Sequence, residues 1–174
     1  MKKRKCFFTL SLLLLYFALK AQVLLPNYTD SLFPAYYHQR VSLFNSLPVT
    51  NNDVVFIGNS ITDGSEWGEL FNDLHIKNRG ISGDITAGVI KRIDEVARHK
   101  PSKIFLMIGI NDLSRGVTAD SVVKNILLIA AYLRQQTVTT QVFIQSILPI
   151  NNSLRKFTSH ISNGMKIRQV NDLL

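Results

Sequence analysis

The segment DVVFIGNSITDG, residues 53–64, sets the fold of this chain. Four consecutive apolar residues at 54–57 are followed directly by Gly-Asn-Ser at 58–60. An uninterrupted apolar run of this length, ended by turn-forming residues, is typical of a strand that is covered on both faces. Residues 54–57 therefore predict the first strand of a parallel sheet.

Strand-like and helix-like segments alternate after this first strand. The further elements predicted, in chain order, are a helix near 67–74, a strand near 76–81, a helix near 86–97, a strand at 104–108, a helix near 123–133, a strand near 142–148 and a helix from about 163. Such alternation indicates an open parallel α/β sheet wound with right-handed crossovers. We expect a single domain over residues 22–174.

For two helices, the sequence predicts which side packs against the protein or faces solvent. Aromatic and apolar residues at spacings of three and four precede the first strand and indicate a helix whose aromatic face packs on the sheet: Phe33, Tyr36, Tyr37, Arg40, Val41 and Phe44. In the helix near 86–97, Thr86 is expected to cap the N-terminus. Charged residues of that helix are expected to face solvent: Lys91, Arg92, Asp94 and Glu95.

The first 21 residues form a separate segment. Basic residues at 2–5 precede an apolar run at 6–19, and small or polar residues follow at 20–22. This is the pattern of a secretory signal peptide, and the run is shorter than the roughly 20 residues of a membrane-spanning helix. We expect cleavage near Ala21, no stable membrane anchor afterwards, and a secreted or periplasmic protein.

Net charge does not favour a nucleic-acid partner. The whole chain carries +8, but five of its 20 basic residues and none of its 12 acidic residues lie in the first 21, which leaves +3 for the remainder. No cluster of basic residues with interleaved aromatics is left. The single cysteine, Cys6, also lies in this first segment, so the exported chain is expected to have no disulfide.

Polar or small residues follow three of the predicted strands. These residues are Ser60, Gly83 and Asn111, and the carboxyl ends of parallel strands meet at one edge of a sheet. A serine there could act as a nucleophile, while the Ser60 N–H, the Gly83 N–H and the Asn111 amide could stabilise an oxyanion. Taken singly, each residue also fits a helix cap or a turn.

The strings IGNSITDG, NRGISGD and IGINDL resemble, in order, the first three motifs of the SGNH (GDSL-like) hydrolase family over about residues 53–150. The resemblance implies a flavodoxin-like three-layer α/β/α sandwich. It also implies Ser60 as the catalytic nucleophile, with Gly83 and Asn111 completing the oxyanion hole. One departure is Asn59, which stands where the familiar first motif has Asp.

The fourth motif of that family, Asp-x-x-His, is absent from this sequence. His38, His75 and His99 are expected away from the strand ends, and His160, after the fourth strand, is the loose candidate for a base. By resemblance the missing motif would follow a further helix and strand beyond Leu174. We therefore expect a domain incomplete at its C-terminus, with its last strand and helix missing, and nearly inactive by itself.

The predicted function is that of an exported serine esterase. It would hydrolyse acyl esters, O-acetyl esters first, of carbohydrates or small lipids through an acyl-enzyme. No cofactor or metal is expected, since the sequence has no phosphate-binding loop, no dinucleotide fingerprint and no His/Cys cluster with metal-ligand spacing. The alternative is a noncatalytic exported protein on the same fold that binds carbohydrate or another partner.

Overall fold

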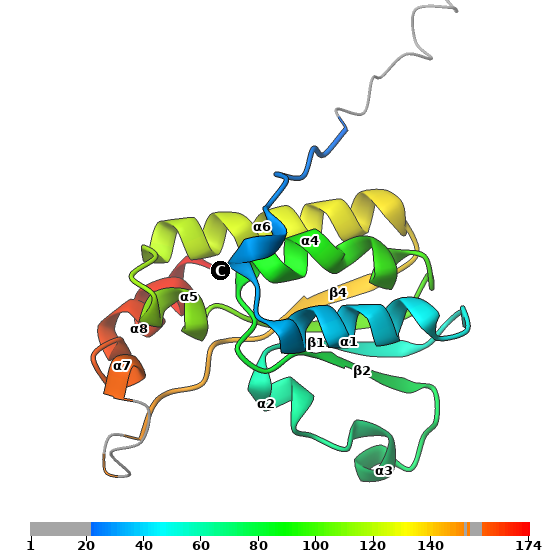
Figure 1. Cartoon of the computed structure of the whole chain (residues 1–174), viewed down its shortest axis with the longest axis horizontal. Helices are drawn as coiled ribbons and strands as arrows, with labels where there is room; N and C mark the ends of the chain where they lie inside the picture. Colours follow the sequence, from blue (N-terminus) through cyan, green and yellow to red (C-terminus); the bar gives the residue numbers. More distant parts are fainter. Residues whose placement is uncertain (1–21, 152, 154–157) are drawn as a thin grey trace, which may run out of the picture.

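Four parallel strands form the central sheet of the computed structural model, in the order β2-β1-β3-β4 (Figure 1). Their bounds are Val54–Gly58 for β1, Ile76–Gly80 for β2, Lys103–Met107 for β3 and Gln141–Ile144 for β4. The chain leaves β1 for β2 on one side and then crosses to β3 on the other, so the strand order reverses beside β1. In such sheets ligands bind at the carboxyl ends of the strands next to this reversal.

The structure describes residues 22–151, 153 and 158–174, so the predicted signal segment 1–21 lies outside the described residues. The helices of the described part are η1 Asp30–Leu32, α1 Ala35–Ser46, α2 Ser60–Asp63, α3 Trp67–Phe71, α4 Thr86–Ala97, α5 Ile110–Ser114, α6 Ala119–Gln136, α7 Thr158–Ile161 and α8 Gly164–Leu173. Within this part, no helix is both long and apolar enough to cross a membrane.

One face of the sheet carries the main hydrophobic core. Alternate strand residues point to this face, because side chains of a strand alternate between its two sides. Val55, Ile57, Ile104 and Leu106 are almost fully buried there against the apolar sides of α4, α6 and α8. Leu127 of α6, by contrast, is 48% exposed.

The opposite face carries a row of stacked aromatic rings. Phe56, Phe105 and Phe143 occupy equivalent positions of β1, β3 and β4, and neighbouring rings lie 4.9 Å apart. Trp67 of α3 stacks on Phe56 with ring centroids 4.1 Å apart. Since α3 lies on this face and α4, α6 and α8 on the other, the predicted three-layer α/β/α arrangement is confirmed.

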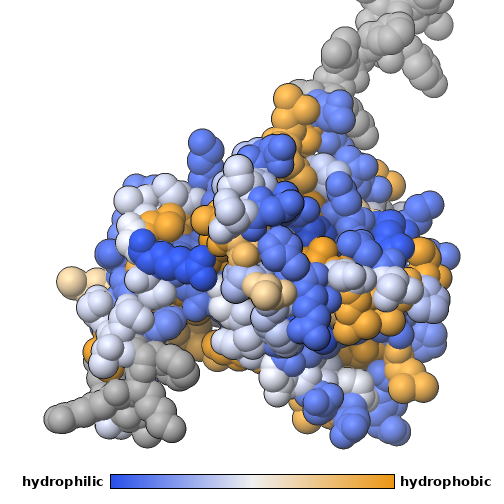
Figure 2. Space-filling model, in the orientation of Figure 1, coloured by the Kyte–Doolittle hydropathy of each residue, from blue (hydrophilic) through white to orange (hydrophobic). Residues whose placement is uncertain are grey.

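Helix α1 packs mainly on α4 and the loop before it. It also meets the sheet at β2, where the Arg79 guanidinium lies 4.8 Å from the centre of the Phe44 ring. The buried face of α1 consists of Tyr37 and Phe44, with Phe33 stacked on Tyr37 at 4.4 Å, and it meets Ile81 and Ile85. The Tyr37 hydroxyl donates a hydrogen bond of 2.8 Å to the carbonyl of Gly88 in α4. On the outside, the surface around α1 mixes polar and apolar residues (Figure 2).

Candidate active site

A cleft of about 620 Å³ lies at the carboxyl ends of β1, β3 and β4. Ser60, Gly83 and Asn111 all line it, so the structure brings together the three residues that the sequence singles out. The remaining wall is mostly apolar and is formed by Ile61, Met107, Ile108, Ile110, Ile147, Leu148, Pro149 and Ile150, with polar side chains from Asn59, Ser82, Asn151 and His160.

Ser60 occupies the first position of α2, directly after the tight end of β1. A side chain at Gly58 would lie 2.2 Å from Thr62 Oγ1 and 2.6 Å from the Met107 carbonyl, so this approach requires glycine. Asn59 caps α2, because its side-chain oxygen accepts the Ile61 N–H at 3.1 Å. The Asn that replaces the family's Asp thus keeps an acceptor there. Ser60 itself is exposed to the cleft.

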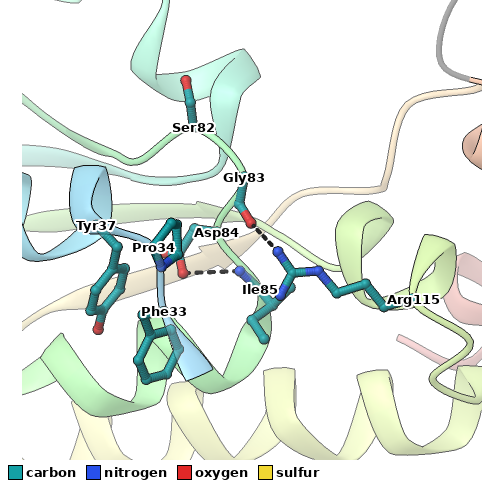
Figure 3. Close-up of a pocket in the computed structure, with 8 residues that line it drawn as sticks. All are labelled: Phe33, Pro34, Tyr37, Ser82, Gly83, Asp84, Ile85 and Arg115. Atoms are coloured by element: carbon teal, nitrogen blue, oxygen red, sulfur yellow. Dashed lines mark hydrogen bonds between the residues drawn. The ribbon is translucent and has the colours of Figure 1, made fainter. Parts of the chain in front are cut away.

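Gly83 occupies the third position of a turn from Ile81 to Asp84, closed by the bond from Asp84 N–H to the Ile81 carbonyl at 3.1 Å. Its φ of +79° lies in the left-handed region that favours glycine. Arg115 donates to the Gly83 carbonyl at 3.1 Å. Figure 3 shows this turn between Arg115 on one side and the Phe33 and Tyr37 rings on the other.

Asn111, in the first turn of α5, has both ends of its amide engaged. Its Nδ2 donates to the Asp84 carbonyl at 2.8 Å, and its Oδ1 lies 3.1 Å from His160 Nε2. These two contacts fix which end of the amide is the donor, and the second N–H of Nδ2 stays available for a ligand. Asn111 and the Gly83 turn are therefore directly connected.

Asp112 is buried behind Asn111, and sequence reasoning missed it. Its carboxylate accepts the Thr86 N–H at 3.0 and 3.1 Å and the Thr86 hydroxyl at 2.6 Å, while Asn125 of α6 donates to that hydroxyl at 2.8 Å. Burial raises the pKa of the Asp112 carboxyl. Thr86 thus connects α4 to α5, and the N-cap of α4 is Ile85 rather than Thr86.

Two charged residues of α4 predicted to face solvent are buried in ion pairs. Arg92 contacts Asp84 at 3.0 Å, and Glu95 contacts Arg79 of β2 at 3.1 Å. Arg92 also reaches the carbonyl of Gly58 at 3.4 Å. Arg92 therefore links Asp84, which follows Gly83, to the end of β1, which precedes Ser60.

The four histidines occupy different environments. His160 lines the cleft, in agreement with its selection as the loose candidate. His99, expected away from the strand ends, is buried with 3% of its surface exposed, and its Nδ1 accepts the Thr50 N–H at 3.1 Å. His75 contacts Asp53 and His38 contacts the Asp30 carbonyl, both outside the cleft. Among the described residues, no three His, Cys, Asp or Glu side chains are grouped so that they could hold a metal ion.

Curated relatives of this chain are acetylhydrolase subunits. Platelet-activating factor acetylhydrolase IB subunit alpha1 of Homo sapiens is 32% identical over 131 residues, which is 70% of this chain and 52% of that protein. Subunit alpha2 of Rattus norvegicus is 29% identical over 124 residues, covering 66% of this chain and 53% of that protein. The chain thus spans about half the length of these relatives.

Solved structures share the fold. A Streptococcus pneumonia protein described as a platelet activating factor superposes with a TM-score of 0.68 and 26% identity, over 79% of this chain and 67% of that one. A GDSL-like lipase from Bacteroides thetaiotaomicron gives a TM-score of 0.62 at 22% identity, over 79% and 68% of the two chains. The model of the GDSL-like Lipase/Acylhydrolase family matches residues 56–174. By this match over most of its length, the chain belongs to the GDSL-like lipase/acylhydrolase family of ester hydrolases.

Proposed function

We propose that this chain carries the nucleophile and the oxyanion hole of a serine esterase. Ser60 is the proposed nucleophile, and the proposed donors to the oxyanion are the N–H groups of Ser60 and Gly83 and the side-chain amide of Asn111. The observation that supports this proposal is the cleft of about 620 Å³ that all three residues line. Each such donor typically lowers the barrier by about 3 kcal/mol.

The reaction follows from these roles. Ser60 Oγ attacks the ester carbonyl carbon, its proton passes to a base, and the carbonyl oxygen becomes an anion held by the donors. Collapse of this intermediate expels the alcohol and leaves an acyl-serine, which water hydrolyses to the acid. The family places the base in an Asp-x-x-His motif, which residues 1–174 do not contain. His160 is the histidine on the cleft wall.

The cleft favours an ester with an apolar group. Apolar side chains from the ends of β3 and β4 form most of its wall, and burying an apolar group against them contributes about 25 cal/mol per Å². Small lipid esters are therefore our first choice of substrate, ahead of carbohydrate esters. An acetyl group as the acyl part of the ester accords with the acetylhydrolase names of the human and rat relatives. Export through residues 1–21 is part of the proposal and is supported by the sequence pattern.

A fluorophosphonate probe tests the proposed nucleophile without requiring turnover. We expect mass spectrometry to find the label on the Ser60 peptide of the full-length protein, by which we mean a protein that also carries the Asp-x-x-His motif, because the Ser60 hydroxyl reacts only when a base activates it. Ser60→Ala should abolish labelling, whereas Ser65→Ala should keep it, because Ser65 belongs to the same loop but bonds to the Ile61 carbonyl. A folded wild-type protein that stays unlabelled would reject the esterase and favour the noncatalytic binding protein.

Protection from this label tests the substrate class. A lysophospholipid with an acetyl ester should compete with the probe at lower concentration than an acetylated xylo-oligosaccharide. The reason is that only the lipid has an alkyl chain that can pack against the apolar wall of the cleft. Stronger protection by the oligosaccharide would reverse the proposed order of substrates.

A further inference from the structure

Asp63, at the end of α2, accepts several hydrogen bonds beside the cleft. Its Oδ2 accepts the Ser82 N–H at 3.0 Å and the Ser82 hydroxyl at 2.6 Å. The same oxygen accepts the Tyr36 hydroxyl at 3.0 Å, and its Oδ1 lies 3.5 Å from Arg40 Nη2. The Asp63 side chain is 9% exposed, so this carboxylate is largely withdrawn from water.

The two partners from α1 lie before the part of the chain that the family model matches. Tyr36 and Arg40 are four residues apart, and residues with that spacing project from one side of a helix. The Arg40 guanidinium also lies over the Phe44 ring, 4.7 Å from its centre. The family match begins at residue 56, so α1 precedes the matched region, and it contacts α2 at Asp63.

Asp63 is itself held firmly against β2. Asn78 of β2 donates to the carbonyls of Thr62 at 2.9 Å and of Asp63 at 3.1 Å. Gly80 approaches so closely that a side chain there would lie 2.1 Å from the Asp63 nitrogen. The carboxylate therefore reaches Ser82 from a fixed position.

Ser82 and Gly83 are the two central residues of the turn from Ile81 to Asp84. The peptide between two such residues is the one whose orientation differs between type I and type II turns, and the Gly83 N–H belongs to it. Asp63 anchors the turn on the Ser82 side, and Arg115 anchors the Gly83 carbonyl on the other at 3.1 Å. These two contacts flank the peptide to which the Gly83 N–H belongs.

We propose that Asp63 is a positioning residue that aims the Gly83 N–H into the cleft, and that Tyr36 and Arg40 make α1 a working part of the oxyanion hole. The inference rests on the proposed esterase function, because it assigns the Gly83 N–H a role in stabilising an anion. Displacement of such a donor by about 1 Å is enough to slow a reaction by roughly 100-fold. Asp63 touches no reacting atom and acts through Ser82.

Kinetics of fluorophosphonate labelling in the full-length protein test this inference. Asp63→Ala should lower the maximal rate of Ser60 phosphonylation by about 10- to 100-fold, with little change in the probe concentration that gives half this rate. Asp63→Asn keeps an acceptor oxygen for Ser82 and should recover part of the rate. Tyr36→Phe should give a smaller loss in the same direction.

Asp94 supplies the matched control, because it also accepts a tyrosine hydroxyl, that of Tyr132, but on the outer side of α4. Asp94→Ala should label at the wild-type rate. Amide exchange by NMR should show faster exchange of the Ser82 N–H in Asp63→Ala than in Asp63→Asn, and unchanged exchange in the core of β1. Circular dichroism confirms that each variant is folded at the assay temperature.

The outcomes separate this inference from the proposed function. A folded Asp63→Ala protein that labels at the wild-type rate would overturn the positioning role while leaving the esterase proposal intact. A loss of rate that only matches the loss of folded protein in both Asp63 variants would also overturn it. If the wild-type protein is not labelled at Ser60, both proposals fail.

Discussion

Asp112 is a buried carboxyl group adjacent to Asn111, and it gives the stability of this protein a specific dependence on pH. Burial raises its pKa above the ordinary value of 3.8, although Thr86 offers hydrogen bonds that lower it. A raised folded-state pKa means that the native protein binds a proton more tightly than the unfolded chain. The stability contributed by Asp112 therefore increases as the pH falls through the raised pKa toward 3.8, and decreases again as the pH rises.

We expect wild type to gain free energy of unfolding relative to Asp112→Asn as the pH is lowered from about 7 to about 4. Asn stays neutral over this range and can still accept the Thr86 N–H, so the difference isolates the titration. Urea unfolding of both proteins at each pH measures it. A difference that shifts in favour of the Asn variant on acidification would contradict the raised pKa.

Gly80 and Gly164 form a contrasting pair of glycines. A side chain at Gly80 would lie 2.1 Å from the Asp63 nitrogen, whereas one at Gly164 would meet no atom within 4 Å. Gly80→Ala should destabilise the protein by roughly 2 to 4 kcal/mol, since the backbone of α2 must move. Gly164→Ala should be neutral or stabilise it by up to about 1 kcal/mol. The urea midpoints of the two variants measure these changes in stability. Equal midpoints would show that the backbone of α2 can move to accommodate the new side chain without loss of stability.

At the scale of elements, the stacked rings hold the second face of the sheet together. Phe56 lies between Trp67 and Phe105 and is 8% exposed, whereas Phe143 ends the row on β4 and is 43% exposed. The rings belong to three different strands and to α3, so their contacts join elements that no single hydrogen-bonded pair connects. Their contribution should decrease from the centre of the row to its end.

Truncation of the central and the terminal ring measures this gradient. Phe56→Ala should cost about 3 to 5 kcal/mol, the usual range for a buried phenylalanine. Phe143→Ala should cost about 1 kcal/mol, because its ring already contacts water. Chemical denaturation followed by circular dichroism gives both values. Similar losses at the two positions would mean that the rings act as a unit and not as independent contacts.

Helix α4 illustrates why helix faces are difficult to read from sequence. Lys91 and Asp94 are exposed as predicted, but Arg92 and Glu95, which were also predicted to face solvent, are buried. They are buried because α1 covers that side of the helix and because Asp84 and Arg79 supply opposite charges. The local periodicity, on which the prediction rested, shows neither the covering helix α1 nor the ion-pair partners Asp84 and Arg79.

For the whole molecule, the Arg92–Asp84 ion pair joins α4, the Gly83 turn and the end of β1. Arg92→Met should destabilise the protein by about 3 to 5 kcal/mol, because Asp84 would be left buried without a counter-charge. Adding Asp84→Asn should restore much of this loss, since the uncompensated charge is then gone. A double-mutant cycle from urea unfolding measures the recovery. Additive losses would show that the two side chains act independently.

The sequence predicted the order of strands and helices and the meeting of Ser60, Gly83 and Asn111, because both follow from local patterns and the geometry of parallel strands. It did not predict the contacts of Asp63 with Tyr36, of Asp112 with Thr86, or of Asn111 with His160. Each of these joins residues more than 25 positions apart. Such contacts depend on how elements pack in three dimensions, so the motifs point to the proposed reacting groups and the structure shows which residues contact them.

Trp67 is the single tryptophan of the chain, so the intrinsic tryptophan fluorescence of the protein reports on one position. Its indole N–H donates to the Thr62 carbonyl at 2.9 Å, two residues after Ser60, while its ring rests on Phe56. Intrinsic emission therefore originates beside α2, the helix that begins with the proposed nucleophile, and can be recorded without a dye. Titration with an acyl ligand can be followed by this emission in real time, on the native polypeptide.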